Sequence, residues 1–191
     1  LIAAGHWNPI SIFLNDGKTL SLQKNNGLDN THGWWNTLEL ADFDNDGDLD
    51  ILAGNWGLNT KFDASVEKPI TLYINDFDDN GSIETVVTHF HGDRETAFAS
   101  KDELAKQMPF LNKKFLFYED FAKASLDELF GKDKLNEAIQ RKAYLLSTSY
   151  FENDGNNNFT LRTLPRLVQS SSVNDIQLVK NDQGKINEIL M

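Results

Sequence analysis

The sequence predicts a mainly β fold, built from about three β-propeller blades that form part of a larger propeller and carry a small helical insertion. Short runs of β-branched and aromatic residues alternate with Asn-Asp-Gly turns, which is the pattern of strands joined by tight turns. Related segments recur at offsets of about 50 to 60 residues, the spacing of four-stranded propeller blades. One stretch lacks this pattern and has helix-capping signals instead.

The repeated segments fall in the first part of the chain, residues 1–99. Ile-Ala-Ala-Gly-His-Trp at residues 2–7 resembles Ile-Leu-Ala-Gly-Asn-Trp at residues 51–56. Pro-Ile-Ser-Ile-Phe-Leu-Asn-Asp at residues 9–16 resembles Pro-Ile-Thr-Leu-Tyr-Ile-Asn-Asp at residues 69–76. We therefore assign residues 1–99 to propeller blades.

Two loops in this part concentrate acidic side chains around a glycine. Residues 42–50 read Asp-Phe-Asp-Asn-Asp-Gly-Asp-Leu-Asp, and residues 76–84 read Asp-Phe-Asp-Asp-Asn-Gly-Ser-Ile-Glu. Positions 1, 3, 5 and 9 of each loop offer side-chain oxygens and position 7 offers a carbonyl, which together form the oxygen-rich set that Ca²⁺ prefers. The glycine at position 6 permits the sharp turn. The sequence therefore predicts one or two bound Ca²⁺ ions.

These loops do not have the spacing of an EF-hand. That motif needs a bidentate Glu at position 12 and flanking helices. Position 12 is Ala53 in the first loop and Val87 in the second, and both lie in apolar runs that indicate buried strands. The alternative interpretation is an Asp/Asn/Gly turn without an ion, but clustered carboxylates would then repel one another.

Residues 100–142 interrupt the repeats, and we expect two to four short helices there, inserted between strands of one blade. Apolar side chains at helical spacing, such as Leu111, Phe115 and Tyr118, predict a stripe that packs against the blades, with a ligand groove as the alternative. Two capping boxes and a helix-terminating glycine mark the helix ends: Ser100 with Glu103, Ser125 with Glu128, and Gly131.

Residues 143–191 are assigned to further blade strands. Asn-Asp-Gly recurs at residues 153–155, and residues 184–190 resemble the segment that follows the glycine of the second acidic loop. This last unit is not expected to hold Ca²⁺ firmly, because the groups at its equivalent positions are uncharged. These groups are Val179, Asn181, Gln183 and Asn187.

About three blades cannot close a ring, since propellers contain about four to eight. An open set of blades leaves two bare sheet edges, and bare edges pair with other strands. We therefore expect a piece of a larger propeller, with possible edge-to-edge self-association of the fragment.

The composition excludes several classes of function. The chain has 18 Lys and Arg against 29 Asp and Glu, a formal net charge of −11, which argues against a nucleic-acid partner. It contains no cysteine, so disulfide scaffolds, iron–sulfur clusters and thiol catalysis are excluded. No transmembrane segment and no nucleophile or phosphate-binding motif is present, and we expect no enzymatic activity in this chain.

The first acidic loop and its flanks resemble a known repeat. Asp-x-Asp-x-Asp-Gly-x-x-Asp between strands, followed by Ile-Leu-Ala-Gly-Asn, resembles the FG-GAP or VCBS repeat, the calcium-binding blade of integrin α-subunit propellers. Gly-Trp-Trp-Asn at residues 33–36 and Gly-Leu-Asn at residues 57–59 look like the exported bacterial branch, which is related to cartilage-acidic-protein-like chains. The insertion is similar to one in members from Bacteroidetes. The resemblance implies an extracellular, periplasmic or outer-membrane location.

The resemblance also implies which groups bind the ion and what the ion does. In this family the cation staples a strand connection, so its implied role is structural. The second loop departs from the family pattern at positions 5 and 9. The implied ligands are Asp42, Asp44, Asp46, Asp50 and the carbonyl of Asp48 in the first loop, and Asp76, Asp78, Asn80, Glu84 and the carbonyl of Ser82 in the second.

Two further groups of residues have more than one interpretation. His89 and His91 would share one strand face and could chelate Zn²⁺, but no third ligand is visible, and polar residues at a strand end are the favoured interpretation. The four tryptophans stand near glycine-rich strand ends and could stack on sugars, although core packing is favoured.

We expect a non-catalytic, calcium-stabilised module of an exported bacterial protein that binds protein or glycan. The alternative is an accessory propeller of a carbohydrate-active enzyme.

Overall fold

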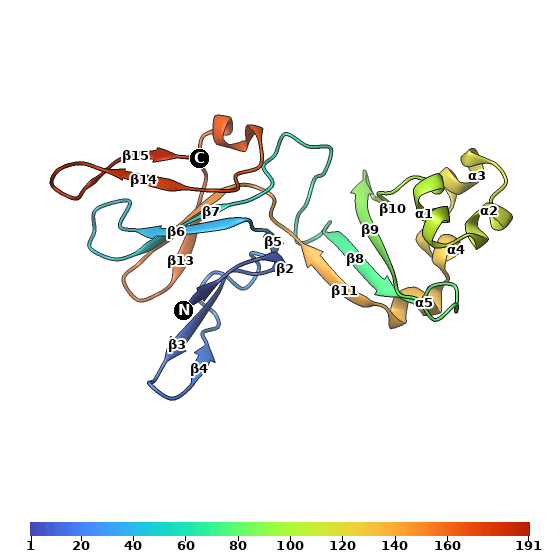
Figure 1. Cartoon of the computed structure of the whole chain (residues 1–191), viewed down its shortest axis with the longest axis horizontal. Helices are drawn as coiled ribbons and strands as arrows, with labels where there is room; N and C mark the ends of the chain where they lie inside the picture. Colours follow the sequence, from blue (N-terminus) through green and yellow to red (C-terminus); the bar gives the residue numbers. More distant parts are fainter. The chain divides into compact units, whose positions relative to one another are not determined.

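The computed structural model describes residues 1–191, which form two compact units. The first unit comprises Leu1–Lys61 and Ala143–Met191, and the second comprises Phe62–Lys142. The chain is mainly β, as predicted, with 15 β-strands, five α-helices and one 3-10 helix (Figure 1). The strands form several open antiparallel sheets, none of which closes into a ring. None of the helices is long and apolar enough to cross a membrane.

The main sheet of the first unit is a four-stranded meander in the order β13-β12-β7-β6. Its strands are β6 (Thr37–Ala41), β7 (Asp50–Gly54), β12 (Ser149–Asn153) and β13 (Phe159–Arg162). The strands pair antiparallel in their order along the chain, but the whole second unit lies between β7 and β12 in sequence. The whole second unit is therefore inserted between two neighbouring strands of this sheet, whereas the sequence analysis expected only residues 100–142 to be an insertion.

Shorter strands complete the first unit. Besides the meander, this unit contains one three-stranded sheet and two strand pairs. The sheet has the order β1 (Ile2–Ala3), β3 (Ser11–Asn15), β4 (Leu20–Leu22), and the pairs are β2 (His6–Asn8) with β5 (Gly33–Trp34) and β14 (Gln177–Lys180) with β15 (Ile186–Leu190). The 3-10 helix η1 spans Arg166–Ser170.

The core of the first unit forms around β7, whose five residues are all buried. Ile51 and Ala53 of this strand pack with Phe151 of β12 and with Trp35. The Trp35 ring meets Phe151 edge-on at a centroid distance of 6.0 Å, and its indole N–H donates to the Thr31 carbonyl at 2.8 Å. The polar end of this buried ring is thus satisfied, and Trp35 has the core role that the sequence favoured.

The second unit combines a four-stranded sheet with the helices. The sheet has the order β10-β9-β8-β11, and the antiparallel pairing of β8 with β9 and of β9 with β10 continues along the chain. The strands are β8 (Ile70–Asn75), β9 (Glu84–His91), β10 (Arg94–Ala97) and β11 (Ile139–Ala143), and the helices are α1 (Lys101–Gln107), α2 (Phe110–Lys114), α3 (Tyr118–Lys123), α4 (Leu126–Phe130) and α5 (Lys132–Glu137). The sequence-based division fell after residues 99 and 142, whereas contacts group β8, β9 and β10 with the helices.

The helix boundaries follow the predicted signals. In the first capping box, the Glu103 N–H donates to the Ser100 hydroxyl and the Ser100 N–H donates to the Glu103 carboxylate. The second box at Ser125 and Glu128 is the same, and Gly131 ends α4 with φ of 86°. Each box satisfies backbone donors that a helix start leaves free.

Two details of the predicted insertion are wrong. Five helices form instead of two to four, because extended residues divide the segment after residue 107 and again after residue 114. The apolar stripe is therefore not one helix face. Leu111 on α2 is fully buried, while Tyr118 starts α3 and is 62% exposed.

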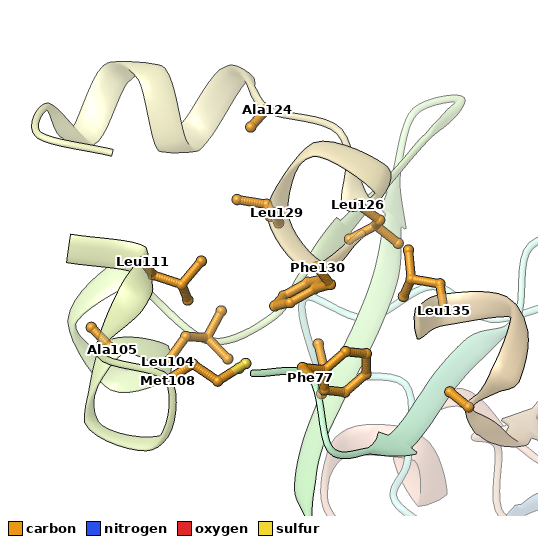
Figure 2. Packing of buried hydrophobic residues seen from close by; sticks show 12 residues of the cluster. Phe77, Leu104, Ala105, Met108, Leu111, Ala124, Leu126, Leu129, Phe130 and Leu135 are labelled. Atoms are coloured by element: carbon orange, nitrogen blue, oxygen red, sulfur yellow. The ribbon is translucent and has the colours of Figure 1, made fainter. Parts of the chain in front are cut away.

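The helices bury their apolar residues against the sheet of their own unit. Leu104, Met108 and Leu111 point toward Phe130, which lies next to Phe77 (Figure 2). The Phe77 and Phe130 ring centroids are 5.4 Å apart. Helices of five to seven residues are unstable alone in water, so this shared core holds them in place.

Met108→Ala should lower the free energy of unfolding of the second unit by about 2–5 kcal/mol, because Met108 is fully buried and truncation leaves a cavity. Denaturant unfolding followed by far-UV circular dichroism measures the change. Leu116→Ala is the control, since Leu116 is 75% exposed and should change stability by less than about 0.5 kcal/mol. Equal effects of the two substitutions would contradict this assignment of the core.

Candidate metal centres

Both acidic loops connect the two strands of an antiparallel hairpin. The first loop joins β6 to β7, and the second joins β8 to β9. In the registers of these hairpins, Ala41 is opposite Asp50 and Asn75 is opposite Glu84. The residue before position 1 is therefore opposite position 9 in each loop, and this pairing brings the first and last acidic positions together.

The first loop is organised by backbone donors that point at its acidic side chains. The Asp42 carboxylate accepts from the N–H groups of Asp46 and Gly47, both at 3.1 Å. Asn45 and Gly47 have φ of 66° and 101°, a left-handed backbone that glycine adopts without strain and that asparagine tolerates better than most residues. The backbone thus folds around position 1.

The second loop has the same arrangement. The Asp76 carboxylate accepts from the N–H groups of Asn80 at 3.1 Å and Gly81 at 2.8 Å. Asp79 and Gly81 have φ of 57° and 87°. The two loops therefore share one turn geometry, although positions 5, 7 and 9 carry different residues.

Position 9 is a buried carboxylate in both loops. Asp50 is fully buried and Glu84 is 4% exposed. The Phe43 N–H donates to Asp50 at 3.0 Å, and the Phe77 N–H donates to Glu84 at 2.9 Å. Each loop is thus closed by a bond from position 2 to position 9.

Three predicted ligands meet in each loop. Their oxygens lie within 4.8 Å of one another, and this suits one ion, because oxygens on opposite sides of Ca²⁺ are about 5 Å apart. The side chains at position 5 accept from the N–H of position 7 instead, Asp46 from Asp48 at 3.1 Å and Asn80 from Ser82 at 2.7 Å. The clusters are Asp42, Asp44 and Asp50 in the first loop and Asp76, Asp78 and Glu84 in the second.

Each loop also contains a carboxylate oxygen without a hydrogen-bond donor. One oxygen of Asp48 and one of Asp78 are buried and have no hydrogen-bond partner. A buried carboxylate oxygen left without a donor is unfavourable unless a cation lies beside it. Either acidic cluster could therefore hold a metal ion.

The two loops differ in electrostatics. Lost hydration raises the pKa of Asp44 and of Asp48, and the charges of Asp46 and Asp50 add to both increases. The pKa of Asp76 is lowered instead, mainly because the Gly81 N–H donates to it, with a smaller contribution from the charge of Lys134. Repulsion among carboxylates is thus stronger in the first loop.

Lys134 is a part of the second site that the sequence analysis missed. Its ammonium donates to the Asp76 carbonyl at 2.8 Å and forms an ion pair with Asp79. In return, the Asn75 side chain donates to the Lys134 carbonyl at 2.8 Å, which fixes α5 beside the loop. Lys134 is more than 50 residues from the loop, so no local pattern could have indicated it.

The first site also has partners that the sequence did not indicate. Asp50 accepts from the Asn153 N–H at 2.8 Å and from the Tyr150 hydroxyl at 3.0 Å. Burial raises the pKa of Tyr150, and its bond to Asp50 raises it further. The Asn153 side chain donates to the Leu49 carbonyl at 3.1 Å. The first loop is therefore joined to β12.

The remaining candidate residues form no comparable site. No cluster of three potential metal ligands includes His89 or His91. The rings of Trp7, Trp34 and Trp56 meet edge-on in series, with both centroid distances 5.3 Å. Trp34 is buried and Trp56 is 43% exposed, so ring packing accounts for much of this group.

Comparison with known proteins identifies part of the chain. Residues 1–53 match the family model of an FG-GAP-like repeat, and the match includes the whole of the first acidic loop. The N-terminal part of the chain is therefore similar to an FG-GAP-like repeat, and the match does not extend beyond residue 53. No curated protein and no solved structure matches the chain.

Tyr150→Phe should destabilise the first unit by about 1.5–3 kcal/mol, because it removes a hydrogen bond to the buried Asp50 carboxylate. All four tryptophans lie in this unit, so their fluorescence during denaturant unfolding measures the change. The control in the same unit is Thr19→Val, which removes a hydroxyl bond to the exposed Asp16 and should change stability by less than about 0.5 kcal/mol. A change of that size for Tyr150→Phe as well would disprove the role of this bond.

Proposed function

We propose that the chain is a non-catalytic, calcium-binding module of the β-propeller-like FG-GAP class, in which each acidic hairpin loop holds one Ca²⁺ ion. The observation that carries this proposal is the shared geometry of the two loops. Two segments of different sequence adopt the same turn and gather carboxylates from positions 1, 3 and 9.

The donor atoms favour Ca²⁺ over other cations. Both sites offer only oxygen, whereas zinc sites are rich in imidazole and thiolate. Mg²⁺ requires near-ideal octahedral geometry and retains its water, while Ca²⁺ accepts six to eight oxygens in a flexible arrangement. Besides the clustered carboxylates, the predicted shell uses Asp46 and the carbonyl of Asp48 in the first loop, and Asn80 and the carbonyl of Ser82 in the second.

The bound ion would stabilise a strand connection. Positions 1 and 9 lie at the two ends of each hairpin loop, so an ion shared by them opposes separation of the strands. In the first site, Asp50 extends this effect to β12 through Tyr150 and Asn153. The pKa of Asp44 is raised mainly by lost hydration and further by the charges of Asp46 and Asp50, and a bound cation would offset that repulsion.

The proposed class of module also suggests a cellular location and a kind of ligand. FG-GAP repeats are typical of extracellular domains, where Ca²⁺ near about 1 mM fills loops of moderate affinity. We infer that the module belongs to an exported bacterial protein and binds a protein or glycan through its loops. The outermost strands of the meander, β6 and β13, provide edges for a further blade or a second copy.

Calcium titration by isothermal calorimetry should give two ions per chain, and Asp44→Asn and Asp78→Asn should each reduce this to one. The pair is matched, because each removes one charge from position 3 of a cluster. At about 1 mM Ca²⁺ and a dissociation constant of about 0.1 mM, each site should add about 1.4 kcal/mol of stability. Asp29→Asn is the surface control. No binding of Ca²⁺ at millimolar concentration would refute the proposal.

Lys134→Met should increase the Ca²⁺ affinity of the second loop by about two- to fivefold, because it removes a positive charge that pairs with Asp79. Calorimetry in an Asp44→Asn background reports this site alone. Lys132→Met, an exposed lysine of the same helix, should leave the affinity unchanged. Weaker binding after Lys134→Met would mean that the lysine chiefly positions the loop.

A further inference from the structure

The second unit contains a cavity that takes no part in the metal sites. Its volume is about 500 Å³, and it lies between β9, β10 and the helices α1, α3 and α4. None of its lining residues belongs to either acidic loop. The volume is within the range of about 300–1,000 Å³ that is usual for small-molecule sites.

Most of the cavity wall is apolar. Ala97, Ala99, Phe121 and Leu129 contribute to it, and the two helices α3 and α4 provide part of one side. Ala97, Ala99 and Phe121 also pack against the helical core of the second unit. The apolar wall is therefore packed against the core of the second unit, and it suits the apolar body of a ligand.

The two charged side chains that line the cavity, Arg94 and Lys101, are both positive. Lys101 is only 7% exposed, and its ammonium lies 5.0 Å from the centre of the Tyr118 ring. The Arg94 guanidinium donates to the carbonyls of Ala122 at 2.8 Å and Ala124 at 2.7 Å, which fixes its position. The pKa of Glu128 is lowered mainly by hydrogen bonds from Ser125, and the positive charge of Arg94 contributes a little to this decrease. Glu128 does not line the cavity.

No aspartate or glutamate lines the cavity, although the chain contains 29 acidic residues. Two carboxylates accept hydrogen bonds from lining residues without lining the cavity themselves: Glu103 accepts from the Ser100 N–H at 2.8 Å, and Asp102 accepts from the Tyr118 hydroxyl at 3.0 Å. The ammonium of an almost buried lysine that meets an aromatic face, in a cavity lined by no carboxylate, attracts an anion. The charge of the cavity is thus opposite to that of the protein as a whole.

We propose that this cavity binds a small organic carboxylate with an apolar body, whose carboxylate group meets Lys101 and whose body lies along Phe121 and Leu129. Charge complementarity selects the anion, and the apolar wall selects the body. Arg94, which also lines the cavity, adds to the positive potential.

Octanoate and 1-octanol are the probes, because they share one apolar chain and differ in charge. In calorimetry with the wild-type chain, octanoate should bind in a 1:1 ratio and at least about tenfold more tightly than octanol. Lys101→Met keeps the length of the side chain and removes its charge, so it should weaken octanoate binding by at least about tenfold. Lys106→Met, an exposed lysine of the same helix, should change the affinity by less than about twofold.

Methyl chemical shifts of the wild-type chain give a measurement that needs no variant. Octanoate should shift the methyl signals of Ala97, Ala99 and Leu129. Equal binding of octanoate and octanol, undiminished octanoate binding by a folded Lys101→Met variant, or octanoate shifts confined to other methyl groups would overturn the proposal.

Discussion

The first unit depends on one buried carboxylate, that of Asp50. A buried charge is tolerated only where hydrogen bonds or a cation compensate for its lost hydration. Asp50 accepts from the Phe43 N–H inside its own loop and from the Tyr150 hydroxyl and the Asn153 N–H of β12. The same group therefore closes the acidic loop and holds together two strands that are about 100 residues apart in sequence.

This connection explains how the sheet tolerates a whole folded unit between neighbouring strands. The entropy cost of closing a loop grows slowly with its length, so a large insertion is acceptable if its ends are held together. The Asn55 N–H donates to the Thr148 hydroxyl at 3.2 Å, and the Asn55 side chain donates to the Leu145 carbonyl at 2.9 Å. The inserted unit then folds around its own core, so its cavity and the first metal site are built from separate sets of residues.

What the sequence predicted well is encoded locally. The capping boxes and the turns of the acidic loops depend on residues within nine positions of one another, and the side chain at each position bonds to nearby backbone. The mainly β character follows from the same short-range patterns. Lys134 and Tyr150 were missed because their contacts cross more than 50 residues, which periodicity does not detect. The single stripe through Leu111 and Tyr118 was wrong because the chain becomes extended between their helices.

The two acidic loops have the same turn geometry but differ in charge. Asp42 and Asp76 accept the same pair of backbone N–H groups, and the glycine at position 6 is left-handed in both, so the turn is fixed by hydrogen bonds that both sequences can make. The charge differs, since Lys134 pairs with the second loop while five aspartates lie in the first. Turn geometry thus places the acidic side chains similarly in both loops, whereas the net charge of each loop would set how strongly it attracts a cation. The differences at positions 5 and 7, Asp46 and Asp48 against Asn80 and Ser82, therefore change the charge of the loop without altering the hairpin, whereas position 9 is a buried carboxylate in both loops.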